Sequence, residues 1–448
     1  MERIKFVLIS PTSPSARVQP GERPHGSRYF RFSMLSSLYV AAAMPPGVET
    51  ELLDEEIQPV DYDTNADLIG ITFMTYNAPR AYEIADRFRS EKHKPVIVGG
   101  YHPTFMPEEA SQHADAVCVG DAEDTVPRMI HDFRAGELQP FYKSSLPDLA
   151  GLPRPDRSLI QQRYYVPAGV MQATRGCPHY CTFCSVTTFH QHHHRTRPVA
   201  EVIEELKTLG PYVQFMDDNL IGDEEYAKEL FTAMIPLRKH WFSQCGLHIA
   251  QDEALLDLAR RSGCNGLFIG FETLSESGLR SWGKLTNVDQ DYAGCIERLH
   301  AAGISVGAGL VFGGDEDRPD VFTRMLDFLL QTNVETLQAT RLTPFPGTPL
   351  FTQMDRDGRI FDKDWSHYDF RHVVFEPRHM SAATLDAGTA WVVREFHTAS
   401  RVAARVAKCL RYLEPQAVLL SVVPVNLAYR DGLVRDGTFE RAAAFQPS

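Results

Sequence analysis

The sequence predicts an α/β protein: a doubly wound, Rossmann-like sheet, then a partial (β/α)6 barrel of the TIM type, then a helical carboxyl-terminal region. Three observations lead to this fold class. Short apolar runs alternate with helical patterns along most of the chain, which is typical of parallel sheets. A proline-rich connector, SSLPDLAGLPRPDR (144–157), separates two such series. The 448 residues exceed one ordinary core and suggest about two or three domains.

The first series predicts the amino-terminal sheet. Its buried strands are expected at 4–9, 67–73, 95–98 and 115–119, with a helical pattern at 78–91. In such sheets ligands bind beyond the carboxyl ends of the strands. Glycines there let a ligand approach the backbone closely. The residues at these ends are Thr75, Tyr76, Gly99, Gly100 and Gly120.

The second series predicts the barrel, because six strand-helix units are too many for a second small sheet. Strands are expected near 169–174, 213–216, 246–250, 266–271, 305–312 and 336–342. The active site of a barrel lies at the carboxyl ends of its strands. We therefore divide the chain into a first domain (1–143), a linker (144–163), the barrel (164–375) and a helical domain (376–448).

The last region is expected to hold helices over 382–411, followed by an apolar segment, AVLLSVVPVNLAY (417–429). This segment suits the core, a lid or a surface for a lipid-like substrate. Core is the commonest of the three, and Pro424 breaks any long interfacial helix.

Charge and cysteine content limit the class of protein. The 58 acidic and 45 basic residues give a formal charge of −13, so no basic field attracts a nucleic acid. No apolar run reaches about 18 residues, so we expect no membrane span. The start, MERIKFVLIS, lacks the regions of a signal peptide, and the eight scattered or clustered cysteines do not resemble a disulfide framework. A cytoplasmic protein is expected.

Three cysteines fall within eight residues directly after the first barrel strand, in ATRGCPHYCTFCSV. Cys177, Cys181 and Cys184 form a CxxxCxxC run that suits a four-iron, four-sulfur cluster, in which three thiolate ligands leave one iron open. A structural zinc site is the alternative. Zinc would need a fourth ligand, from His179 or from the histidines of FHQHHHRTRP (189–198).

This run, with the aromatic Phe183 before its last cysteine, resembles the radical S-adenosylmethionine (SAM) superfamily. The resemblance implies that SAM binds the open iron through its amino and carboxylate groups. An electron from the cluster would cleave SAM to methionine and a 5′-deoxyadenosyl radical. An external donor such as flavodoxin or ferredoxin would supply that electron.

The endings of the later strands extend the resemblance. Asp217 and Asp218, in FMDDN, lie where the family usually has a GGE-like motif and would accept hydrogen bonds from the SAM ammonium, or would cap the helix near Glu224. Glu272 resembles the ribose-contacting acid of the family, with a structural salt bridge as the alternative. Gly313, in GLVFGGDED, suits close passage of adenine or methionine.

The histidine-rich stretch 189–198 does not predict a second metal site, because a regular element would scatter its histidines. Arg195 and Arg197 are expected instead to donate hydrogen bonds to a carboxylate or phosphate.

The segment VGGYHPTFMPEEASQHADAVCVGDAED (98–124) resembles the cobalamin-binding domain that precedes the barrel in one large radical SAM class. Similarity over 41–56, 67–76 and 364–377 brings the chain near the group of hopanoid C-methylases and bacteriochlorophyll-pathway methylases. No DxHxxG supplies an axial histidine, and His102 is not assigned to cobalt. The resemblance implies a cobalamin without a protein histidine, bound by the five residues at the first sheet's strand ends, with its lower face near Thr75 and Tyr76. A purely structural sheet is the alternative.

The resemblance implies a C-methyltransferase that acts on an unactivated carbon of a small, hydrophobic natural product or lipid-like substrate. One SAM would supply the methyl group through methylcobalamin, and a second would yield the radical. No catalytic side chain is assigned. The alternatives are a cobalamin-linked radical oxidase or cyclase and a cobalamin carrier or sensor. A methylthiotransferase is excluded, because it would need a second cysteine trio upstream, where only Cys118 is found.

Overall fold

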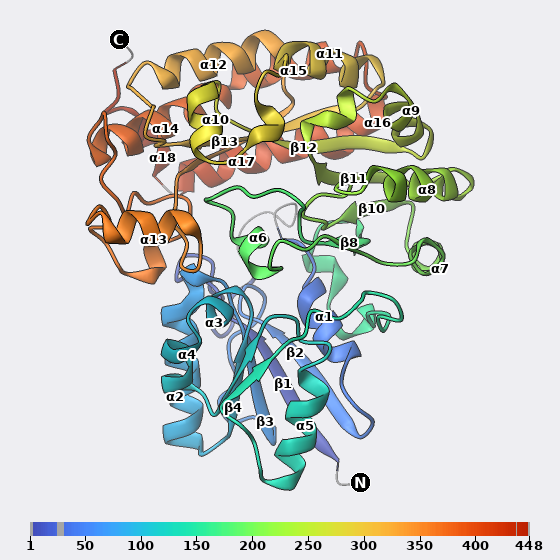
Figure 1. Ribbon diagram of the computed structural model, residues 1–448, viewed down its shortest axis with the longest axis vertical. Coiled ribbons are helices and arrows are strands. Elements are labelled where there is room, and N and C mark those ends of the chain that lie inside the picture. The colour runs from blue at the N-terminus through green and yellow to red at the C-terminus, as the bar shows by residue number, and fades with distance from the viewer. Residues whose placement is uncertain (1–2, 25–30, 436, 447–448) are drawn as a thin grey trace.

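Two parallel six-stranded sheets organise the chain in this computed structural model, which describes residues 3–24, 31–435 and 437–446 (Figure 1). The first sheet lies at one end of the molecule and the second at the other. None of the helices among these residues has both the length and the apolar character needed to cross a bilayer.

The amino-terminal sheet is doubly wound, as predicted. Its strand order is β2-β1-β3-β4-β5-β6, and every pairing is parallel. The strands are β1 (Ile4–Ser10), β2 (Val48–Asp54), β3 (Leu68–Thr72), β4 (Val96–Gly99), β5 (Ala116–Val119) and β6 (Phe141–Lys143).

Helices cover both faces of this sheet. One face packs against α2 (Ala78–Lys92) and α4 (Pro107–His113). The other packs against α1 (Leu35–Ala42) and α5 (Val126–Ala135), through Leu38, Val126 and Met129 among others. The short α3 (Tyr101–Phe105) follows β4 at the carboxyl edge, where it faces the second sheet (Figure 1).

The second sheet is the partial barrel, with strand order β7-β10-β11-β12-β13-β14 and parallel pairings throughout. Its strands are β7 (Gly169–Met171), β10 (Tyr212–Phe215), β11 (His240–Cys245), β12 (Cys264–Glu272), β13 (Ser305–Phe312) and β14 (Thr336–Arg341). The helices between and after them are α7 (Val199–Thr208), α8 (Glu224–Met234), α9 (Glu253–Arg261), α10 (Glu276–Ser281), α11 (Tyr292–Ala301), α12 (Val321–Thr332) and α13 (Pro349–Arg356).

One barrel strand differs from the prediction. Residues 246–250 were expected to form the third strand, but β11 ends at Cys245 and Leu247–Ala250 is a 3₁₀ turn. In β11 the buried Trp241, Ser243 and Cys245 alternate with more exposed residues. This alternation includes polar side chains, so the more apolar GLHIA beside it gave the stronger sequence signal.

The carboxyl-terminal region is helical, as predicted: α14 (Ala382–Phe396), α15 (Ala399–Cys409), α16 (Pro415–Ala417), α17 (Val423–Arg435) and α18 (Thr438–Ala442). Leu385, Trp391 and Phe396 of α14 join the core of the barrel. The apolar segment 417–429 is also helical. Its Val418–Val422 stretch is a π-helix that continues directly into α17, so the expectation that Pro424 breaks the helix was wrong. Pro424, which has no N–H to donate, lies directly after this π-helical irregularity.

Candidate active site between the two sheets

The cysteine run lies in a loop between two short elements, β8 (Thr174–Arg175) and α6 (Ser185–Phe189). The loop begins at Gly176, whose φ is +82° and where a Cβ atom would lie 2.1 Å from the His193 carbonyl oxygen, so only glycine fits. Thr182 then anchors its middle: its N–H donates to the Trp282 carbonyl (2.8 Å) and its own carbonyl accepts from the Leu350 N–H (3.0 Å). The loop is therefore fixed to the barrel on two sides.

The three thiols have surroundings that suit a cluster. Burial raises the pKa of Cys181 to about 12, while the Lys284 ammonium lowers it, and Cys177 has a raised pKa for the same main reason. Metal binding replaces the proton of such a thiol. The Asn219 amide lies 3.8 Å from the Cys177 sulfur as a hydrogen-bond donor, and hydrogen bonds to sulfur tune iron-sulfur clusters.

Among the described residues, no three His, Cys, Asp or Glu side chains converge to hold a single metal ion. A four-iron cluster does not need such a point, since each cysteine binds a different iron. The residues present fit that group.

Asp217 follows β10 but turns away from any open space. Its carboxylate is fully buried and accepts hydrogen bonds from the backbone N–H groups of Ala173 and Thr174 and from the Thr174 hydroxyl. Burial raises its pKa to about 7. It does not cap α8 either, because Asp223 does so by accepting from the Tyr226 N–H. The structure thus shows Asp217 holding the turn that leads from β7 into the cysteine loop.

Asp218 has the more open position of the two. One carboxylate oxygen accepts from the Gly176 N–H at 2.9 Å, and the side chain lines the large cavity described below. Burial raises its pKa to about 6, and the Gly176 hydrogen bond and the Arg175 charge oppose this rise. Of the two aspartates, Asp218 is the one that can reach a ligand.

Glu272 ends β12 in an unusual backbone conformation. Its φ is +62°, and the register between β12 and β13 shifts between Gly270 and Glu272. Such shifts redirect side chains, and strained positive-φ residues gather at functional sites. The carboxylate forms an ion pair with Lys284 (3.1 Å), so the salt bridge that the sequence analysis gave as the alternative is present. Both charges act on the Cys181 thiol, which places the pair beside the cysteine loop.

Phe183 and Gly313 are both packed within the barrel. The Phe183 ring stands edge-on to Trp282, with centroids 5.4 Å apart. A Cβ atom on Gly313 would meet Leu385 (2.7 Å), and its N–H donates to Asp317. Contact of either residue with SAM stays a prediction.

A cavity of about 570 Å³ lies where the carboxyl ends of the first sheet face the barrel. The first sheet contributes its strand ends together with α1 and α5, and the barrel contributes Gln172, Arg175, Phe189, His190, Met216 and Asp218. The cavity continues between α1 and α5 along the sheet face, past the small residues Gly70 and Cys118. A bulky ligand with an extended tail fits such a shape, as the implied cobalamin would require.

Four of the five residues expected to bind cobalamin line this cavity: Tyr76, Gly99, Gly100 and Gly120. Gly100 needs its glycine, because its φ is +106° and a Cβ atom would lie 2.7 Å from the Phe73 carbonyl oxygen. Thr75 is buried and does not line the cavity.

His102 lies apart from the cavity. It is fully buried, and its Nε2 pairs with the Tyr82 hydroxyl (3.0 Å) and with Glu109 (3.2 Å). This position agrees with leaving it unassigned to cobalt.

The side chains of the histidine-rich stretch point to different partners. His192 stacks on Tyr180, and His194 Nε2 lies 3.3 Å from the Asn219 carbonyl oxygen. Arg195 and Arg197 do bind carboxylates, but these belong to the chain itself, namely Asp121 (2.7 Å) and Glu205 (2.7 Å).

Sequence reasoning gave no role to Asp121, Glu123, Arg175 and Lys284, and it considered His190 only as a possible zinc ligand. Some of these residues lie in stretches that the sequence analysis singled out, but each becomes relevant to the site through a partner that the local sequence does not indicate.

Comparisons with known proteins agree with this geometry. The family profile described as "B12 binding domain" matches residues 27–130, and that of the "Radical SAM superfamily" matches residues 171–329. Bacteriochlorophyllide d C-12(1)-methyltransferase of Chlorobaculum tepidum is 31% identical over 420 residues, covering 90% of each chain. The C-8(2)-methyltransferase of the same organism is 27% identical over 74% of this chain and 78% of its own.

A solved structure shares the fold. The radical SAM methyltransferase TsrM from Kitasatospora setae, with cobalamin and a [4Fe-4S] cluster bound, superposes with a TM-score of 0.63 at 16% identity. The match covers 93% of this chain and 92% of that one. Both sheets and their order thus have a counterpart that holds the implied cofactors, and the chain belongs to the family of cobalamin-dependent radical SAM methyltransferases.

Proposed function

We propose that the chain methylates an unactivated carbon of a small, hydrophobic natural product or lipid-like molecule and consumes two SAM molecules per turnover. One SAM would donate its methyl group and leave as S-adenosylhomocysteine. The other would be cleaved to a 5′-deoxyadenosyl radical, which takes a substrate hydrogen and leaves as 5′-deoxyadenosine. The supporting observation is the cavity between the sheets, which the strand ends around Gly99 and Gly120 border on one side and Asp218 on the other.

The cofactor contacts are part of the proposal. Cys177, Cys181 and Cys184 would hold the cluster, which supplies the electron for SAM cleavage. Cobalamin, which carries the methyl group, would lie against Tyr76 and the three glycines of the strand ends, with Thr75 behind them. Asp218 would accept from the SAM ammonium, and Glu272 would reach its ribose, with Phe183 and Gly313 nearby. Proximity then selects the carbon that is methylated, since a bound radical reacts with the nearest group.

The substrate class is inferred from the lining of the cavity. Phe32, Met74 and Met216 line it and are among the more exposed large apolar side chains, at 41%, 36% and 37% of their surface. A substrate that shares this cavity with the cobalamin would contact these side chains, and such a lining favours an apolar molecule. Relatives named for a bacteriochlorophyllide substrate agree with this class.

The second candidate is a radical oxidase or cyclase of the same architecture. It would release 5′-deoxyadenosine without S-adenosylhomocysteine. The two candidates therefore differ in a measurable product.

Anaerobic reconstitution with iron, sulfide and cobalamin, followed by product analysis with SAM and a flavodoxin or ferredoxin donor, tests the proposal. We expect retained cobalamin, and S-adenosylhomocysteine and 5′-deoxyadenosine in equal amounts once an acceptor is methylated. A holoenzyme that turns over substrate and forms only 5′-deoxyadenosine would favour the oxidase or cyclase. A protein that binds the cluster but no cobalamin would contradict both.

The neighbouring aspartates provide a matched pair of variants. Asp218→Asn is expected to weaken SAM binding about tenfold, because a charge-assisted hydrogen bond to the ammonium is lost. Asp217→Asn is expected to lower the free energy of unfolding by about 1–3 kcal/mol, because an amide nitrogen cannot accept from buried N–H groups. Equilibrium SAM binding and denaturant unfolding of both variants check this. If Asp218→Asn bound SAM as tightly as the parent protein, Asp218 would not belong to the proposed SAM site.

A further inference from the structure

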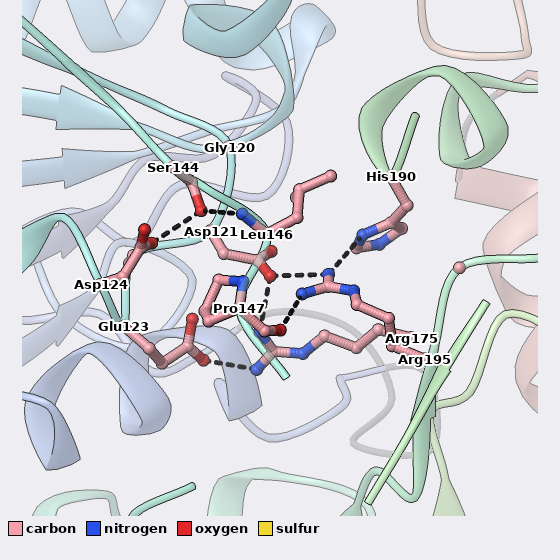
Figure 2. Close-up of polar contacts among 12 residues, drawn as sticks. Gly120, Asp121, Glu123, Asp124, Ser144, Leu146, Pro147, Arg175, His190 and Arg195 are labelled. Carbon is pink, nitrogen blue, oxygen red and sulfur yellow. Dashed lines mark hydrogen bonds and ion pairs between the residues drawn. The ribbon is translucent and has the colours of Figure 1, made fainter. Parts of the chain in front are cut away.

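At the edge of the cavity, a network of buried charges joins the first sheet to the residues that flank the cysteine loop (Figure 2). Asp121 and Glu123 lie in the loop after β5 of the first sheet. Arg175 of β8 and Arg195 of β9 (Arg195–Thr196) lie on a separate two-stranded antiparallel sheet, whose strands precede and follow the cysteine loop. Arg195 lies 2.7 Å from Asp121, and Arg175 lies 3.3 Å from Asp121 and also binds Glu123. All four side chains are at most 11% exposed.

Arg195 extends the network towards the cysteine loop. One of its N–H groups donates to the Pro147 carbonyl in the connector (2.7 Å), and another reaches His190 Nδ1 at 3.1 Å. An arginine only donates, so Nδ1 must accept and the proton of the ring lies on Nε2. Burial lowers the pKa of His190 to about 4, which keeps the imidazole neutral.

The other ring nitrogen faces Asp218. His190 Nε2 lies 3.7 Å from an Asp218 oxygen, and that same oxygen accepts from the Gly176 N–H at 2.9 Å. A continuous series of contacts therefore runs from Asp121, which follows Gly120, to Gly176, which precedes Cys177.

We propose that Asp121, Arg195 and His190 are positioning residues that hold the loop of Gly120 and the loop of Cys177 at a fixed separation. This inference rests on the proposed function, in which these two loops hold different cofactors. Transfer of the SAM methyl group must cross between the loops, whereas SAM cleavage needs only the loop of Cys177. The network would therefore control the balance between the two reactions.

The network need not hold the sheets together. α3 lies next to α6 (Figure 1). There Tyr101 stacks on Phe189 with ring centroids 4.5 Å apart, and this apolar contact does not depend on the charges. Buried ion pairs contribute little net stability, and in some proteins they select one arrangement among several. Loss of one ion pair should therefore let the distance between the two loops vary while the sheets stay in contact.

The test uses the reconstituted holoenzyme with SAM, titanium(III) citrate as reductant and no methyl acceptor. The methyl group of one SAM would pass once to the reduced cobalamin, since no acceptor removes it, and S-adenosylhomocysteine would leave. At the cluster, an electron from titanium(III) would cleave a second SAM to methionine and the 5′-deoxyadenosyl radical, which would take a hydrogen atom from the buffer and leave as 5′-deoxyadenosine. The two products are therefore compared as initial rates within the first turnover. In Asp121→Asn we expect the ratio of S-adenosylhomocysteine to 5′-deoxyadenosine to fall about tenfold, since small misplacements have large effects on rate. Arg195→Lys, which keeps the charge but loses the fork of donors, should give a smaller fall.

A spectroscopic readout complements the products. Cob(II)alamin and the reduced cluster are both paramagnetic, and their spin-spin interaction in the holoenzyme reports the distance between them. We expect a broader distance distribution in Asp121→Asn, with unchanged iron and cobalamin contents.

Asp124→Asn is the matched control. Asp124 lies in the same loop, but its carboxylate accepts hydrogen bonds from Ser144 (Figure 2) and from Ser145, and it forms no ion pair with Arg175 or Arg195. In Asp124→Asn, the ratio of S-adenosylhomocysteine to 5′-deoxyadenosine and the distance distribution should equal those of the parent protein. An Asp121→Asn protein with the parent's ratio and distances overturns the inference, and so does one that loses cobalamin, because Asp121 would then be a binding residue. A parent that binds no cobalamin instead contradicts the proposed function.

Discussion

A Cys181→Ala variant is expected to lose the iron-sulfur cluster and, with it, the cleavage of SAM. Cys181 is the most buried of the three thiols, at 8% exposed, and lies between the other two in the loop. Even partners that only orient a metal ligand change activity by about 10–100-fold when mutated, so loss of a ligand should exceed that range. We expect 5′-deoxyadenosine formation to fall by more than about a hundredfold.

Iron content, the absorbance of the cluster and its electron paramagnetic resonance signal measure the first effect, and product analysis the second. Cys264→Ala is the matched control: Cys264 is also buried but begins β12, at the end of the strand opposite to the active site. Its cluster should form normally. A Cys181→Ala protein with full iron content and SAM cleavage would show that the loop does not hold the cluster.

The cysteine site could be predicted from sequence because its parts are local. Three thiols within eight residues, directly after a strand, need no tertiary contact to be recognised. The strand positions followed for the same reason: most barrel strands are apolar runs, and 305–312 matches β13 residue for residue.

The other parts of the candidate site could not be predicted, because they depend on contacts between residues that are distant in the sequence. Asp121 and Arg195 are 74 residues apart, and nothing near either of them marks the pair. Glu272 is visible as an acid after a strand, but its ion pair with Lys284 appears only once α10 has brought that lysine back. The difference between Asp217 and Asp218 is likewise set by which way each side chain turns at the strand end.

Local signals also fail where tertiary structure supplies the burial. The edge strand β2 was not predicted as a strand, because VETELLD is mostly polar and only its neighbouring Leu52 and Leu53 are buried. It forms because a full parallel register with β1 pairs its backbone. The misplaced third barrel strand has the same cause.

Cys118, in the wall of the cavity, offers a direct test of the proposed cobalamin site. Cys118 of β5 faces α5, where its sulfur lies 2.9 Å from the Thr125 hydroxyl oxygen, and it lines the cavity on the sheet face. A Cβ atom on the neighbouring Gly99 would lie 3.3 Å from the Cβ atom of Cys118, so this part of the sheet face has little room for a larger side chain. An indole ring at position 118 would therefore project into the space between α1 and α5.

A Cys118→Trp variant is expected to bind cobalamin about a hundredfold more weakly, or by ~3 kcal/mol, because its ring occupies volume that the ligand needs. Cobalt content after gel filtration and equilibrium binding monitored by absorbance measure this. The cluster signal of the barrel should be unchanged, since Cys118 lies outside the barrel.

Cys118→Ala is the matched control, because it removes the same thiol without filling the cavity. It should keep cobalamin affinity within a few-fold of the parent. Overpacking alone typically costs about 1–3 kcal/mol of stability, so a graded Cys118→Leu variant separates a filled cavity from an unfolded sheet. Affinity should fall with side-chain size while the sheet remains folded. If Cys118→Trp bound cobalamin as tightly as Cys118→Ala, the ligand would have to lie elsewhere, and the proposed contacts at Gly99, Gly100 and Gly120 would fail with it.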